Sequence, residues 1–103
     1  MTEVAIVHRY PQAAALTAAV GGHGIAVLHA LIRRADTIDG QLVASVSLRD
    51  LCIDVPASKD TIGRRLDQLA RTGIIEVVPH RNGPFVANTY LLHLDSHGIE
   101  LVA

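Results

Sequence analysis

The stretch SKDTIGRRLDQLARTGIIEVV, residues 58–78, decides the fold that this sequence predicts. Its first part has the hydrophobic period of an amphipathic helix with one apolar side. That apolar side consists of Ile62, Leu66, Leu69 and Ala70. The opposite side is polar, has Thr61 and Arg65 on its flank, and consists of Asp60, Arg64, Gln68 and Arg71. One face is therefore expected to pack against a core, and the other is free to meet solvent or a partner.

Capping residues mark both ends of this helix. Ser58 is a favoured N-cap, because its side-chain oxygen can accept a hydrogen bond from an amide of the first turn. Gly73 stands where a left-handed residue ends a helix at low cost, and the run IIEVV predicts a strand after it. Gly63 lies inside the helix and weakens it by up to ~1 kcal/mol. This glycine permits either a tight helix–helix contact or the close approach of a partner.

The sequence before residue 58 predicts a second core helix and several short elements. IAVLHALIRRA, residues 25–35, is helical, with arginines at the C-terminal end that the helix dipole favours. The other elements are a strand or irregular arm at 3–9, a short helix at 11–20, a glycine break at 21–24, a loop at 36–41 and a strand at 42–46. Ser47 and Asp50 have the spacing of a capping box, which begins a short helix, and Pro56 forces the chain to turn.

The sequence after the helix predicts a β-hairpin. The strand IIEVV is followed by PHRNGPFVA, in which Asn82-Gly83 is a turn signal, and then by the strand NTYLLHL. Two helices joined by a tight turn and followed by a hairpin are the layout of a winged helix-turn-helix.

Between Ser47 and Ile75 the sequence resembles the DNA-binding regions of GntR-type and MarR-type bacterial regulators. The residues that carry the resemblance are SLRDL, followed by Ser58, Thr61, Arg64, Leu66, Leu69, Gly73 and Ile74. The ending NTYLLHL is similar to the last strand of winged helices in phage and plasmid replication proteins. Pro56 and Ala57 depart from the pattern, because such turns more often carry glycine and a larger apolar residue.

This resemblance implies an α+β fold with a three-helix core and a β-hairpin wing. Residues 23–103 would form the winged helix, and residues 1–22 an N-terminal arm or helix. The helix at 58–72 would enter the major groove of double-stranded DNA, and the wing at 79–88 would touch the backbone or a minor groove. The residues expected at the DNA are Ser58, Lys59, Thr61, Arg64, Arg65, Gln68, His80, Arg81 and Asn82. Arg64 and Gln68 suit guanine and adenine edges, whereas the residues near the helix N-terminus suit phosphates.

The charge distribution agrees with this expectation only locally. The chain of 103 residues has a net charge of −1, which provides no global attraction to nucleic acid. Residues 58–82 carry five Lys or Arg against three acids, a net charge of +2, while the remaining residues carry a net charge of −3. The positive charge is thus concentrated where a DNA-binding surface would need it, although arginines opposite a leucine stripe are also typical of a solvated helix face.

Other functional classes have less support in the sequence. The single cysteine, Cys52, excludes an intramolecular disulfide and fits a reducing cytoplasm. Residues 10–32 carry no Asp, Glu, Lys or Arg, but their glycines and alanines make a membrane span less suitable than a buried helix. No cofactor motif or nucleophile–base pair is evident, so we do not expect an enzyme. A weak metal hypothesis rests on His93, Asp95 and His97.

Three functions remain open from the sequence. The first is a small DNA-binding transcriptional regulator, expected to be a cytoplasmic repressor without an effector domain. It would form a homodimer through the apolar and alanine-rich residues 1–22, unless that arm simply completes the core. The second is a plasmid or phage replication or partition protein that binds DNA repeats. The third is a winged helix used for protein–protein assembly.

Overall fold

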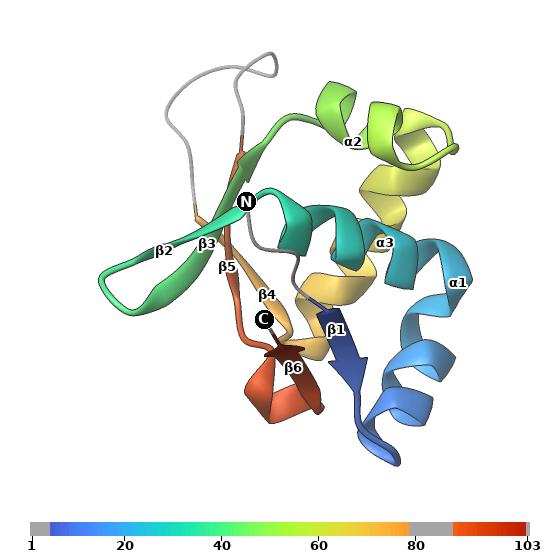
Figure 1. Ribbon diagram of the computed structural model, residues 1–103. Coiled ribbons are helices and arrows are strands. Elements are labelled where there is room, and N and C mark those ends of the chain that lie inside the picture. The colour runs from blue at the N-terminus through green and yellow to red at the C-terminus, as the bar shows by residue number, and fades with distance from the viewer. Residues whose placement is uncertain (1–4, 79–87, 103) are drawn as a thin grey trace.

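The computed structural model describes residues 5–78 and 88–102 of the chain and has an α+β fold, as predicted (Figure 1). The helices are α1 (Gln12–Arg33), α2 (Leu48–Asp54), α3 (Lys59–Thr72) and the short 3₁₀ helix η1 (Asp95–His97). The strands are β1 (Ala5–His8), β2 (Ala35–Ile38), β3 (Gln41–Val46), β4 (Ile75–Val78), β5 (Asn88–Leu92) and β6 (Ile99–Val102). The α-helices gather on one side of the molecule, and β2 to β5 lie on the other.

The strands form two antiparallel sheets. The larger sheet has the order β2-β3-β5-β4, and β1 pairs with β6 in a separate ribbon. Leu42 lies opposite Leu92, and Ala44 lies opposite Tyr90. Because side chains alternate along a strand, these residues share one face, where Ala44, Tyr90 and Leu92 are buried. The order of β3, β5 and β4 around α2 and α3 is compatible with a winged-helix-like arrangement.

Helix α1 lies across α3 and is kinked at Gly21 (Figure 1). Gly21 has φ 71° and ψ 179°, a backbone conformation that is essentially confined to glycine. The predicted break at residues 21–24 is therefore a kink at one residue, and the two predicted helices are the two halves of α1. Beyond the kink, Val27, Leu28 and Leu31 are fully buried in the core.

The prediction of a loop at residues 36–41 is wrong. Strand β2 pairs with β3 through a two-residue turn at Asp39 and Gly40, which have φ 52° and φ 78°. Positive φ at both central residues is the type I′ geometry, whose twist suits a two-residue hairpin. The dipeptide Asp-Gly is a sequence signal for this turn, but the polar composition of residues 36–41 is also typical of a loop.

The two helices of the predicted helix-turn-helix begin and end where the sequence indicates. The amide of Asp50 donates to Ser47 Oγ over 3.1 Å, and the amide of Ser47 donates to the Asp50 carboxylate over 3.1 Å, which completes the capping box. Residues 55–58 form the turn, in which the Val55 amide donates to the Leu51 carbonyl over 2.8 Å. Helix α3 then runs from its N-cap Ser58 to a left-handed Gly73.

The predicted N-terminal arm packs on the rest of the chain. Strand β1 pairs with β6, a strand that the sequence analysis did not predict, in the register Ile6↔Leu101 and His8↔Ile99. Leu16 and Val20, in the first half of α1, are 4% and 1% exposed. The first half of α1 therefore belongs to the same hydrophobic core as the helices that follow.

Helix α1 is long and apolar enough to cross a membrane by length and composition alone, with a mean hydropathy of 1.6 over its most apolar window. In the fold, 44% of that window is buried. Buried core helices pass the same test, and the fully buried Val27, Leu28 and Leu31 give α1 that role here.

Candidate nucleic-acid interface

Helix α3 separates a buried side from an exposed polar side. Ile62, Leu66 and Leu69 are buried, with exposures of 0%, 6% and 0%. The exposed residues on the other side are Lys59, Asp60, Arg64, Asp67 and Arg71. The predicted amphipathic pattern is therefore confirmed. Two aspartates share the exposed side with the cations, so its positive charge is smaller than the arginines alone suggest.

The hydroxyl groups at the start of α3 are arranged to meet an acceptor. The amide of Thr61 donates to Ser58 Oγ over 3.2 Å, and Ser58 Oγ donates to Thr61 Oγ1 over 3.0 Å. Since Thr61 Oγ1 accepts this bond, its own hydroxyl hydrogen remains available to donate. A donor at a helix N-terminus, beside the exposed Lys59, suits an anionic oxygen such as that of a phosphate.

Arg65 differs from the exposed cations of α3, because its side chain contacts Gln68. Arg65 Nη1 donates to Gln68 Oε1 over 2.8 Å, and both side chains are half-buried. Arg65 Nη1 also lies 4.0 Å from the position that a Cβ atom on Gly21 would occupy. Arg65 is thus held against the kink of α1, whereas Arg64 is exposed.

Gly63 lies in open space on α3. A Cβ atom added at this residue would have no described heavy atom within 4 Å, apart from its own helix backbone and chain neighbours. Within the described residues, a tight helix–helix contact therefore does not explain this glycine. The other interpretation, the close approach of a partner, stays a hypothesis.

The three predicted wing residues, His80, Arg81 and Asn82, lie outside the described residues, as does most of the predicted wing at 79–88. Strands β4 and β5, which flank this segment, pair in the register Val78↔Thr89 and Ile75↔Leu92. They provide the two strands of the predicted hairpin.

An ion pair that the sequence analysis did not identify holds α2 in place. Arg34, just after α1, donates through Nε to Asp54 Oδ2 over 2.6 Å and through Nη2 to Asp54 Oδ1 over 3.1 Å. The hydrogen bonds from Arg34 lower the pKa of the Asp54 carboxyl below its ordinary value. The two groups are 20 residues apart in the sequence, so no local pattern indicates that they meet. This contact links the C-terminal ends of α1 and α2.

Arg49 is a further exposed cation, on the first turn of α2. Its position next to the capping box is readable from SLRDL, but the sequence analysis assigned it no role. Helix α2 begins two residues after β3, so Arg49 lies close to one end of the larger sheet (Figure 1).

The histidines of the weak metal hypothesis have other partners. His93 Nε2 lies 3.4 Å from Glu76 Oε1, and His97 Nε2 lies 2.8 Å from the Thr72 carbonyl oxygen. Because a carbonyl only accepts, His97 Nε2 carries a proton in this contact. In the part of the chain that the structure describes, no group of three or more His, Cys, Asp or Glu residues could hold a metal ion. His97 instead anchors η1 to the end of α3.

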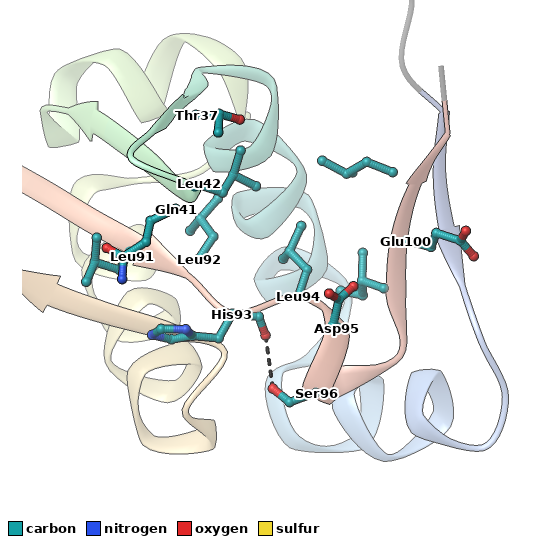
Figure 2. A pocket seen from close by; sticks show the side chains of 13 residues that line it. Thr37, Gln41, Leu42, Leu91, Leu92, His93, Leu94, Asp95, Ser96 and Glu100 are labelled. Carbon is teal, nitrogen blue, oxygen red and sulfur yellow. Dashed lines mark hydrogen bonds between the residues drawn. The ribbon is translucent and has the colours of Figure 1, made fainter.

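A cleft of about 580 Å³ with a mixed polar and apolar lining lies between the end of the larger sheet and β6, and Figure 2 shows it from close by. Leu42, Leu92 and Leu94 project into it, and Gln41, His93 and Asp95 lie along its margin. Ser96 Oγ, at the same margin, donates to the His93 carbonyl over 3.3 Å. The cleft lies at the Leu92 end of β5, whereas the candidate interface is the exposed side of α3, which contributes no residue to the cleft lining.

Comparison with protein-family models, with curated proteins and with solved structures finds no match for this chain. The resemblance to GntR-type and MarR-type regulators therefore stays a prediction from the quoted residues.

Proposed function

We propose that this protein is a small double-stranded DNA-binding regulator, which inserts α3 into the major groove and sets the β4–β5 hairpin beside it as a wing. The observation that carries the proposal is a capped, amphipathic α3 that follows α2 after a four-residue turn and exposes one polar face. An α-helix with its side chains is about 10–12 Å wide, which matches the width of the major groove.

The proposed contacts divide into two kinds. Ser58, Lys59 and Thr61 lie at the N-terminus of α3, where free donors and the helix dipole favour phosphates. Arg64, one turn further on, is exposed on the polar side and suits the O6 and N7 atoms of guanine. Phosphate contacts would set the position of the protein on the duplex, and Arg64 with Gln68 would read sequence.

We propose further that two copies bind paired half-sites as a symmetric dimer, because one α3 reads only a short sequence. The first half of α1 has an exposed alanine-rich side, which is suitable for packing against a copy of itself. This side consists of Ala14, Ala15, Ala18 and Ala19. Sedimentation at micromolar concentration tests the dimer: Ala15→Glu is expected to convert a dimer to a monomer, and a monomeric wild type contradicts the dimer.

A protein-assembly function is the second candidate, and two observations favour it. Asp60 and Asp67 lie on the exposed side of α3, where they would repel phosphates. Ile53, on α2, is 75% exposed, and its burial against a partner protein would contribute favourable hydrophobic free energy. Under this alternative, the exposed side of α3 would bind a protein surface.

Salt dependence distinguishes the two functions, because each neutralised phosphate releases counterions. Binding to a labelled random duplex is measured by fluorescence anisotropy between about 50 and 200 mM salt. We expect Lys59→Ala to reduce the slope of log affinity against log salt by about 1. Arg9→Ala, which removes an exposed cation between β1 and α1, is the matched control and should leave the slope unchanged. Salt-independent or undetectable binding would favour protein assembly.

A further inference from the structure

We infer that Arg65 is a positioning residue that makes Gln68 a hydrogen-bond donor selective for guanine. The inference rests on the proposed function, in which α3 lies in the major groove. It assigns Arg65 a role different from that of Arg64, although the two residues are adjacent and have the same side chain.

The side chain of Arg65 lies beside α1. This side chain is half-buried, and its Nε atom is enclosed without a hydrogen-bond partner among the described residues. Its Nη1 atom is 4.0 Å from where a Cβ atom on Gly21 would lie, so the guanidinium occupies space beside the kink of α1. A side chain held against α1 in this way is turned from the groove that Arg64 would face.

A hydrogen bond from Arg65 orients the side-chain amide of Gln68. Arg65 Nη1 lies 2.8 Å from Gln68 Oε1. A guanidinium group has donors and no acceptor, so the amide atom that faces it must be the carbonyl oxygen. The amide NH₂ group of Gln68 consequently points away from Arg65. Gln68 is four residues after Arg64 and three after Arg65, which places it between them on the helix surface.

The orientation of the Gln68 amide determines which base edge it can recognise. A glutamine reads adenine by donating to N7 and accepting from N6, which requires both ends of the amide. With its carbonyl directed at Arg65, Gln68 presents mainly donors. Guanine offers two acceptors in the major groove, N7 and O6, whereas cytosine offers a donor. Arg65 therefore shifts the preference of Gln68 from adenine to guanine.

The test measures the affinity of purified protein for duplexes that carry each of the four bases at each position of the selected site. Gln68→Ala identifies the position that Gln68 reads, because only that preference disappears. At this position we expect the wild type to prefer guanine over adenine about tenfold. Arg65→Met should reduce the preference to less than about twofold, because the freed amide can rotate and accept from adenine.

Methionine preserves the apolar stem of Arg65 and removes a buried nitrogen without a described partner, so Arg65→Met is expected to fold. Thermal melting checks this directly. Arg71→Met, on the exposed side of the same helix, controls for the loss of one charge. It should weaken all duplexes similarly or not at all.

An unchanged guanine preference in Arg65→Met overturns the inference. Equal weakening of every duplex also overturns it, since that result makes Arg65 a phosphate contact. A wild type with no base preference at any position instead overturns the proposed function, so the two failures are distinguishable.

Discussion

The Nε2 atoms of His8 and His29 lie 2.8 Å apart and join β1 to α1. The ring centroids are 5.1 Å apart, so the two nitrogen atoms face each other nearly head-on. One hydrogen atom fits between them, which requires one ring to donate and the other to accept. A second proton in this position would break the hydrogen bond and place two positive charges in contact.

This pair predicts that the protein loses stability in mild acid. Burial of the ring lowers the pKa of His29 below its ordinary value of 6.5, and the nearby His8 and Arg33 lower it further. The unfolded chain therefore takes up a proton at His29 at a higher pH than the folded chain does. The contribution of His29 to stability is complete above pH 6.5 and is lost as pH falls through the lowered pKa.

Urea unfolding at several pH values measures this effect. His29→Gln should decrease the dependence of the unfolding free energy on pH between neutral and mildly acidic solution. His23→Gln, which changes an exposed histidine on the same helix, is the control and should keep the wild-type dependence. Identical pH profiles for His29→Gln and the wild type would refute the assignment.

Gly21 and Gly22 form a matched pair for the kink of α1. Gly21 has φ 71° and ψ 179°, and a side chain there would strain the backbone. We expect Gly21→Ala to lower the unfolding free energy by about 1–3 kcal/mol. Gly22 has open space at its Cβ position, so Gly22→Ala should be neutral or slightly stabilising. Equal effects of the two substitutions in chemical denaturation would contradict the kink.

Gly63 allows stability and binding to be separated. Since a Cβ atom there meets no described neighbour, Gly63→Ala should stabilise the protein by about 0.5–1 kcal/mol through helix propensity. If the glycine permits close approach to DNA, the same variant binds duplex more weakly despite its higher melting temperature. Unchanged or improved duplex affinity would show that the partner does not approach Gly63.

The N-cap of α3 gives a prediction for stability. Ser58 Oγ accepts a hydrogen bond from the Thr61 amide, so Ser58→Ala should cost about 1 kcal/mol of unfolding free energy. Ser58→Asp keeps an acceptor at this position and should preserve most of the stability. A Ser58→Ala variant with wild-type stability would mean that the cap is not formed in solution.

The parts of the fold that the sequence predicts well depend on local signals. The capping box at Ser47 and Asp50, the N-cap Ser58 and the left-handed Gly73 each satisfy backbone groups within one turn. Their positions are therefore readable from a few neighbouring residues. The same holds for the exposed side of α3, whose helical period is independent of the rest of the chain.

Other parts depend on contacts between distant residues. Strand β6 has four residues and is defined by its pairing with β1, at the other end of the chain, so its own pattern indicates little. Arg65 falls on the flank of the predicted helix, and only the crossing of α1 with its kink at Gly21 determines that its side chain is half-buried. The β2–β3 hairpin is different, because Asp39-Gly40 is a local turn signal that lies within a segment of loop-like polar composition.

The most direct test of the central claim is selection of bound sequences from a random pool of duplexes, with the wild type and Arg64→Ala side by side. Arg64 is exposed on α3 and has no packing role that its loss would disturb within the described residues. We predict that the wild type enriches a defined motif, and that Arg64→Ala loses the preference for guanine at one position of each half-site. Absence of any enriched motif at low salt, from a folded wild-type protein, would contradict the proposal that α3 reads DNA.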